Sequence, residues 1–363
     1  MGWSGSFSEV GSVMRRASWD PRIVVASFLD PLEPGGDRAS ALACLHSPDV
    51  DTADRRLPAN EIDVLALITG ASGFVGRHLR QHLESSGDEV VGTDRADGGP
   101  DLLDPEGLRA LVGSVAPDVV YHLAGDADVG GSWNHPADTF RANAEGTLHL
   151  LEACRAAEVR RVIAISSADV YGVVTPGELP LTEQSELRPT SPYAASKVAA
   201  EYLCLQAWRG WGLGVVPVRA FNHVGPGQSP AFLAPAIASR IAEAEERGDD
   251  EITVGNVTPA RDLTDVRDVV RAYRLLAVSG RPGIVYNVCS GSTLTVEEIC
   301  RLLISAAKRP LRLVPDPSLQ RPVDIPVLCG SHERLSTDTG WQPSIPVAQS
   351  LADLLDDCRR RRS

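Results

Sequence analysis

Several features that mark other protein classes are missing from this chain of 363 residues. No apolar run approaches the roughly 20 residues that a membrane-spanning helix requires, so a membrane is not an expected partner. The N-terminus lacks the charged-then-apolar order of a secretory signal. The seven cysteines are scattered and include no Cys-x-x-Cys pair, which indicates reduced thiols and argues against a disulfide framework or a zinc site. These absences predict a cytoplasmic protein without a bound metal.

Basic side chains are also fewer than acidic ones. The chain has 35 Lys and Arg against 48 Asp and Glu, which gives a formal net charge of −13. Such a surface is poor at neutralising a phosphate backbone, so a nucleic acid is not an expected partner. A local basic pocket for one small anionic ligand stays compatible with this charge. Hydrophobic residues make up 43% of the chain, enough for a sizeable core, and the length predicts one large or two closely packed domains.

The composition changes along the chain. Residues 1–61 are rich in Ser, Asp, Pro and Gly, which predicts a poorly ordered leader, an accessory segment or a misplaced translation start. Residues 62–220 alternate predicted strands and helices, the pattern of an α/β fold with a doubly wound parallel sheet. Residues 221–358 are expected to form mainly a smaller, mixed α/β lobe, with some segments returning to the first domain, and residues 220–228 at its start are expected to form a loop. Residues 359–363 are interpreted as a basic, solvated tail.

A glycine-rich turn follows the first predicted strand, the continuous apolar run at 64–69. Its glycines are spaced Gly-x-x-Gly-x-x-Gly, and a helical pattern begins directly after them. This context is what a dinucleotide-binding loop needs, because the glycines let the backbone approach the pyrophosphate and the helix N-terminus faces its charge. The residues expected to line the cofactor here are Gly70, Ser72, Gly73, Phe74, Val75 and Gly76.

The second predicted strand ends in Asp94, 18 residues beyond Gly76. An acidic residue at this place accepts the adenosine ribose hydroxyls and repels a 2′-phosphate, which favours NAD. Arg95 follows directly and is compatible with NADP, so we expect NAD(H) or NADP(H) with a slight preference for NAD. Asp101 and Leu102 are candidates for contact with the adenine edge, and a simple turn is the alternative for Asp101.

Two later strands, predicted at 119–123 and 161–166, are expected to end at the sheet edge where ligands of open α/β folds bind. The first ends in small residues, which permit close approach of a cofactor, and its candidate contacts are Leu123, Ala124 and Gly125. The second delivers a polar segment that includes Ser167.

Tyr193 and Lys197 are the candidates for proton transfer. Four residues apart, they lie on one face of a predicted helix. Lowering a tyrosine pKa from near 10 to about 7 requires about 4 kcal/mol, the order that a cation about 4 Å away supplies at an effective dielectric of about 20. Lys197 is therefore predicted to tune Tyr193 as a general acid/base. A packed ring beside a solvated lysine is the alternative for such a pair taken alone.

The segment 70–76, Asp94, Ser167, Tyr193 and Lys197 together resemble the extended short-chain dehydrogenase/reductase family of sugar-nucleotide epimerases, dehydratases and reductases. The resemblance covers about residues 63–358 and implies a Rossmann domain, a smaller C-terminal substrate domain and a homodimer. It implies that Tyr193 is the acid/base, that Lys197 holds the nicotinamide ribose, and that Ser167 hydrogen-bonds the reacting sugar oxygen.

The same resemblance implies a set of supporting residues. Asn143, within Asn-x-x-Gly-Thr, is expected to order the central strand region beside the cofactor. Asn222, Arg261 and Arg321 resemble family contacts to a nucleotide-diphosphate sugar. Arginine suits a diphosphate because it is permanently charged and binds bidentately, although a surface ion pair is the alternative for either arginine.

The finer pattern at 123–136, 221–228, 261–269 and 321–326 is most similar to GDP-4-keto-6-deoxy-D-mannose reductases. It implies reduction of the C4 ketone of a nucleotide-diphosphate 4-keto-6-deoxyhexose, with GDP favoured. A 4-epimerase or a 4,6-dehydratase, such as a GDP-mannose 4,6-dehydratase, is the alternative, and a non-catalytic NAD-binding sensor is a third. The resembling dehydratases carry a glutamate where this chain has Asp169, a candidate substrate contact that is one methylene shorter.

Overall fold

The computed structural model describes residues 64–316, 319 and 325–362. The expected leader at 1–61 and the candidate Arg321 lie outside the described residues. None of the described helices is long and apolar enough to cross a membrane. The six cysteines of the described part are free thiols.

Six parallel strands form the main sheet, in the order β2-β1-β3-β4-β5-β9. Their central members are apolar on both faces, which a strand covered by helices on both sides requires. The chain steps outward from β1 in both directions, so a topological switch point lies between β1 and β3, where ligands of such folds bind. The strands are β1 (Leu65–Thr69), β2 (Glu89–Thr93), β3 (Val119–His122), β4 (Arg161–Ser167), β5 (Val215–Ala220) and β9 (Tyr286–Val288).

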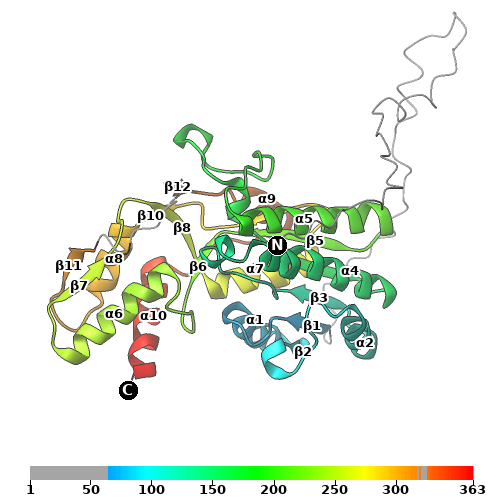
Figure 1. Ribbon diagram of the computed structural model, residues 1–363, viewed down its shortest axis with the longest axis horizontal. Helices are drawn as coiled ribbons and strands as arrows, with labels where there is room; N and C mark the ends of the chain where they lie inside the picture. The colour runs from blue at the N-terminus through cyan, green and yellow to red at the C-terminus, as the bar shows by residue number, and fades with distance from the viewer. Residues whose placement is uncertain (1–63, 317–318, 320–324, 363) are drawn as a thin grey trace, which may run out of the picture. The chain divides into compact units, whose positions relative to one another are not determined.

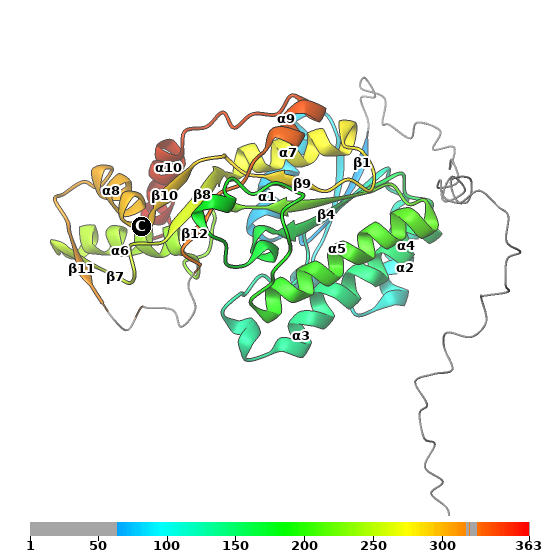
Figure 2. The ribbon, with the colours of Figure 1, turned by 90° about the horizontal axis from the view of Figure 1, so that it is seen from above.

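Helices cover both faces of this sheet, and the α/β expectation is confirmed. One hydrophobic cluster joins one face to α1 (Phe74–Ser85), α7 (Val266–Ser279) and α9 (Glu333–Thr339). A second joins the other face to α2 (Pro105–Val115), α4 (Gly146–Ala156) and α5 (Pro192–Trp211). Figure 2 shows α7 and α9 on the side of the sheet away from α4 and α5.

Residues 136–156 form a helix that is not uniform. It begins as α3 (Pro136–Phe140), continues as one π-helical turn over Arg141–Glu145, and returns to α-helix as α4. Single π-turns inside α-helices are frequent at functional sites. This turn carries Asn143.

A smaller lobe is built from segments far apart in the chain. Three helices, α6 (Leu233–Arg247), α8 (Val296–Ser305) and α10 (Val347–Arg362), share one apolar core. Figures 1 and 2 show α10 beside α6, about a hundred residues apart in sequence, and α8 close to both. The strands are β6 (Asn222–Val224), β7 (Glu251–Val254), β8 (Ala260–Asp265), β10 (Thr293–Thr295), β11 (Arg312–Pro315) and β12 (Val327–Leu328).

One expectation for this lobe is wrong, and a second holds only in part. The segment expected as a loop at 220–228 contains β6, which pairs in parallel with β8. The basic segment expected as a solvated tail is the last turn of α10; Arg360, Arg361 and Arg362 are exposed as expected, but Arg359 is not. Arg359 there is only 16% exposed and binds Glu245 of α6 through two hydrogen bonds of 2.7 and 2.8 Å. The sequence alone could not show this contact, because Glu245 lies on a helix more than a hundred residues earlier in the chain.

Candidate active site

The glycine turn has the geometry of a phosphate cradle. Gly70 adopts a left-handed φ of +74°, and a Cβ there would lie 2.8 Å from the Ala124 nitrogen, while one at Gly76 would collide with the Gly70 carbonyl oxygen. Helix α1 begins after Gly73, and among the described residues no side chain caps its N-terminus. Its first-turn N–H groups are therefore available to an anion. The turn fits a dinucleotide pyrophosphate.

Asp94 lies beside this turn, as expected. Its carboxylate accepts a hydrogen bond of 3.0 Å from the Ala96 nitrogen and others from Ser72. Burial alone would raise the pKa of Asp94, but these hydrogen bonds hold it below the ordinary value. Arg95 is 81% exposed and pairs with Asp101 at 3.2 Å.

The carboxylate of Asp101 also accepts from the Leu103 nitrogen, the geometry of an Asx turn. The Leu102 carbonyl bonds His149, and its side chain packs at the base of α4. Contact of either residue with adenine stays a prediction.

Asn143 braces the segment that follows β3. Its side-chain oxygen accepts from the Asp126 nitrogen at 2.8 Å, and its amide donates to the Asp126 carbonyl at 3.0 Å and to Ser196 at 2.9 Å. Gly125 leaves room for this, because a Cβ there would lie 2.5 Å from the Asn143 oxygen. Ser196 in turn donates to the Tyr193 carbonyl at 2.7 Å. Asn143 thus connects the strand end to the helix of Tyr193.

A buried polar chain that the sequence did not reveal lies beneath Asn143. The Ala124 nitrogen donates to Thr69, which donates to His122 Nδ1 at 2.9 Å. His122 Nε2 donates to Thr147 at 3.0 Å, and Thr147 donates to the Asn143 carbonyl at 2.6 Å. Because Thr147 donates its own proton to the Asn143 carbonyl, Nε2 carries a proton; the lowered pKa keeps the ring neutral, so Nδ1 accepts from Thr69. Burial lowers the pKa of His122 to about 3, with a smaller contribution from Lys197. The only sequence signal was a histidine inside an apolar strand.

Ser167, Tyr193 and Lys197 are brought together at the end of β4. Ser167 accepts from the Asp169 nitrogen at 3.2 Å and hydrogen-bonds the Tyr193 side chain. Tyr193 lies in the first turn of α5, whose N-cap Ser191 accepts from the Ala194 nitrogen. The Lys197 ammonium donates to the Ile165 carbonyl at 3.0 Å.

The expected tuning of Tyr193 by Lys197 is not what the structure has. The ammonium lies 5.9 Å from the centre of the Tyr193 ring and is held by the Ile165 carbonyl. Burial raises the pKa of Tyr193, the charges of Asp169 and Asp126 raise it further, and only the Ser167 hydrogen bond lowers it. Burial also lowers the pKa of Lys197 to about 8. The Tyr193 phenol is therefore protonated at neutral pH.

The candidate substrate contacts lie on neighbouring strands of the smaller lobe. Asn222 is exposed on β6, opposite Leu263 of β8. Arg261 of β8 is half-buried and donates to the Ile325 carbonyl at 2.7 Å. Asp169 is half-buried in the 3₁₀ turn Ala168–Tyr171, and its charge acts on Tyr193. Asp169 thus directly follows β4 of the main sheet, whereas Asn222 and Arg261 lie on paired strands of the smaller lobe. Contact of these three residues with substrate stays a prediction.

A nucleotide-binding turn at the switch point of a parallel sheet, with a tyrosine and lysine at the neighbouring strand end, defines a class: NAD(P)-dependent oxidoreductases of the extended short-chain dehydrogenase type, which act on nucleotide sugars. Residues 66–289 match the NAD dependent epimerase/dehydratase family, and the chain belongs to it. The cofactor is NAD or NADP.

Comparison with individual relatives shows which nucleotide-sugar enzymes this chain is similar to. The GDP-6-deoxy-D-mannose reductase of Pseudomonas aeruginosa is 40% identical over 299 residues, which cover 81% of this chain and 97% of that protein. The structure of RMD from the same organism, complexed with NADPH, superposes with a TM-score of 0.76 at 39% identity over 82% of this chain and 99% of that one. The UDP-glucose 4-epimerase of Thermus thermophilus, in complex with NAD, gives 0.73 at 30% identity over 82% and 99%.

Proposed function

We propose that this enzyme reduces the C4 ketone of a nucleotide-diphosphate 4-keto-6-deoxyhexose, with the GDP-linked 4-keto-6-deoxymannose as the favoured substrate. The observation that carries the proposal is the 40% identity to a GDP-6-deoxy-D-mannose reductase across 97% of that protein. NAD(P)H, when bound, would supply the hydride that adds to C4 and would be released as NAD(P)⁺. The ketone oxygen takes a proton and becomes a hydroxyl, so the reaction is balanced.

The chain's own residues supply the proton and the alignment. Tyr193 is the general acid, and a phenol held protonated by burial and by the nearby carboxylates suits a reaction that must deliver a proton. Ser167 polarises the ketone from the end of β4. Lys197, anchored on the Ile165 carbonyl, holds the nicotinamide ribose.

We propose that Asn222 and Arg261 of the smaller lobe bind the nucleotide diphosphate of the substrate, together with Arg321, which lies outside the described residues. For the cofactor we propose a slight preference for NAD(H). Asp94 stands at the glycine turn, and Arg95 is engaged by Asp101. The ratio of kcat/KM for NADH to that for NADPH measures this preference directly. We also propose a cytoplasmic location.

The purified protein, incubated with GDP-4-keto-6-deoxymannose and NADH or NADPH, should oxidise one cofactor per sugar reduced, followed by nicotinamide absorbance and by mass spectrometry of the sugar. Tyr193→Phe is the matched control, because it keeps the ring and removes only the acidic proton. Absence of oxidation with both cofactors would rule out the reductase.

A 4-epimerase or 4,6-dehydratase is the second candidate, and Asp169 beside Tyr193 is the observation that favours it. Such an enzyme would retain tightly bound NAD, accept an unoxidised nucleotide sugar and show no net redox change. Asp169→Ala separates the two. A dehydratase should lose exchange of the C5 proton with solvent deuterium, whereas a reductase should keep most of its activity.

A homodimer formed through the helices near 137–157 and 192–209 is also proposed. Phe140 of α3 and Tyr202 of α5 are 49% and 59% exposed on adjacent helices, an unusual exposure for large apolar side chains. Light scattering should give twice the monomer mass, and Tyr202→Glu should shift the population toward monomer.

A further inference from the structure

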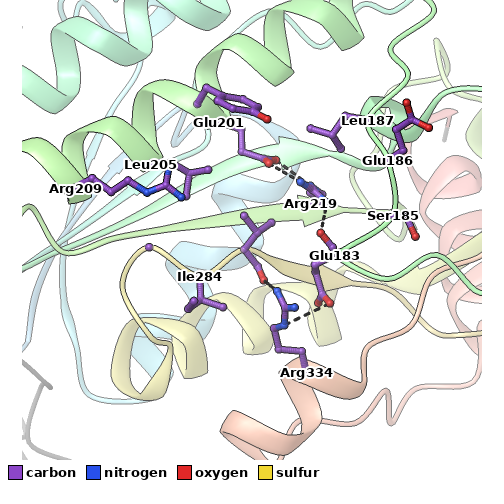
Figure 3. A pocket seen from close by; sticks show the side chains of 13 residues that line it. Glu183, Ser185, Glu186, Leu187, Glu201, Leu205, Arg209, Arg219, Ile284 and Arg334 are labelled. Atoms are coloured by element: carbon purple, nitrogen blue, oxygen red, sulfur yellow. Dashed lines mark hydrogen bonds and ion pairs between the residues drawn. The ribbon is translucent and has the colours of Figure 1, made fainter. Parts of the chain in front are cut away.

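A cavity of about 410 Å³ borders α5 and β5, and a buried ion pair forms part of its wall. Figure 3 shows Glu201 and Arg219 facing each other there, with Glu183 and Arg334 below them. Arg219 Nε donates to Glu201 at 3.0 Å, and its Nη2 donates to the other carboxylate oxygen at 2.6 Å. The two side chains are 5% and 1% exposed.

The remaining nitrogen of the Arg219 guanidinium binds other elements. Nη1 donates to the Tyr171 hydroxyl at 2.9 Å and to the Glu183 carbonyl at 3.2 Å. The guanidinium also lies 5.0 Å from the centre of the Tyr171 ring. The Tyr171 hydroxyl donates a hydrogen bond of 2.7 Å to the side-chain oxygen of Asn287. All three nitrogens of Arg219 are therefore engaged, each with a fixed direction.

These partners belong to the elements that carry the reacting side chains. Glu201 comes four residues after Lys197 and eight after Tyr193, so all three lie on one side of α5. Tyr171 ends the 3₁₀ turn that begins directly after Ser167. In the pairing of β4 with β5, Arg219 stands opposite Ser166, and the next residue stands opposite Ser167. One guanidinium thus ties α5, the Ser167 turn and β5 together.

A buried ion pair of this kind is weak evidence for stability, because desolvation of both charges offsets their attraction. Its planar fork does restrict geometry, since a bidentate arginine fixes both distance and angle to its carboxylate. We infer that Arg219, through Glu201 and Tyr171, is a positioning residue that sets how Tyr193 meets Ser167 in the reduction. The kinetic part of this inference rests on the proposed function.

The kinetic test uses Arg219→Lys, which keeps the charge and loses the fork. The expected result is a fall in kcat of at least about tenfold, with the dissociation constants of cofactor and nucleotide sugar within about twofold of wild type. Arg209→Lys is the matched control, because Arg209 lines the same cavity from α5 but is exposed, and it should leave all three constants unchanged. Unchanged kcat in a folded Arg219→Lys protein, with only a lower melting temperature, would overturn the inference.

Chemical rescue gives a second variant. The cavity reaches Arg219, so guanidinium added to Arg219→Ala should restore part of the lost kcat, and urea at the same concentration should not. Equal effects of the two solutes would speak against a positioning role. If Arg219→Ala does not fold, Glu201→Gln replaces it, because it keeps the shape and removes the charge; kcat equal to wild type in this variant would likewise overturn the inference.

A readout without turnover separates the inference from the proposed function. The chain has six tyrosines, so ¹³Cζ-tyrosine labelling gives a countable spectrum in which Tyr193→Phe assigns one signal. That signal should move in Arg219→Lys and stay in place in Arg209→Lys. Movement in a protein without reductase activity would leave positioning intact and remove the proposed reaction. An active wild type in which neither kcat nor this signal responds to Arg219→Lys would remove the positioning role alone.

Discussion

The two lobes of this enzyme are ordered by different means. In the main sheet, the glycine turn, Asn143 and His122 are joined by backbone contacts and by buried hydrogen bonds with defined directions. In the smaller lobe, Asn222 is exposed and Arg261 is half-buried. Under the proposed function this difference corresponds to a division of roles, in which the first lobe carries the reacting groups and the second binds the nucleotide sugar. Substitutions in the two lobes should therefore affect different kinetic constants.

The largest effect is expected from Tyr193→Phe. Loss of the proton donor should lower kcat by about 10³-fold, within the range for general acids, while cofactor affinity stays within about twofold. Stopped-flow reduction with saturating substrate measures kcat, and fluorescence titration measures the affinity for the cofactor. A kcat near wild type would place the proton donor elsewhere and undo the division between lobes.

Gly76→Ala should act mainly on the cofactor. The added methyl group collides with the Gly70 carbonyl, and a displacement of the turn that costs ~1–3 kcal/mol weakens binding about 5- to 150-fold. Gly113→Ala is the control, because this exposed glycine of α2 has open space around it. Titration calorimetry with NADH and NADPH compares the two variants. Equal affinities would show that the turn does not hold the pyrophosphate.

Arg261→Lys tests the second lobe. Loss of the bidentate fork should raise KM for the nucleotide sugar about tenfold, equivalent to ~1.4 kcal/mol, with kcat nearly unchanged. Initial rates over a range of sugar concentrations separate the constants. A fall in kcat with constant KM is the contrary result, and it would assign chemistry to both lobes.

The smallest effect on activity at neutral pH is expected from the titration of His122, which instead changes stability in acid. Its folded pKa of about 3 lies below the unfolded value near 6.5, so the unfolded chain takes up the proton first. The stability contribution is complete above pH 6.5 and falls by up to about 1.4 kcal/mol per unit as the pH drops toward 3. Urea unfolding at pH 7 and pH 5 should show this loss in wild type. His122→Gln, which cannot titrate, should show a shallower dependence; identical slopes would contradict a buried neutral histidine.

Sequence patterns were most informative where function depends on local geometry. Three features are each confined to one element or its end, so they can be recognised in the sequence itself: the glycine turn, the acid at the end of β2 and the Tyr193–Lys197 spacing. Five of the six parallel strands, β1 to β5, were equally accessible, because strands buried on both faces are continuously apolar, whereas β9 falls in the range expected mainly in the smaller lobe.

Features that depend on contacts between residues far apart in the chain could not be predicted from the sequence. Strand β6 exists only because β8, some forty residues later, lies beside it, and Arg359 is held by an acid on α6. The direction of the Lys197 ammonium depends on a carbonyl of β4. Helical spacing placed Lys197 on the same face as Tyr193 but said nothing of which neighbour it would bind.

Strand β9 has a practical consequence for protein engineering. It lies along the outer edge of β5, yet the chain reaches it only after passing through the first segments of the smaller lobe, β6 to β8. A fragment that stops at residue 220 would leave β5 with an unpaired edge and would be prone to aggregate. A chimera that exchanges substrate lobes between relatives should therefore keep 266–288, which supply α7 and β9, with the parent of the cofactor domain.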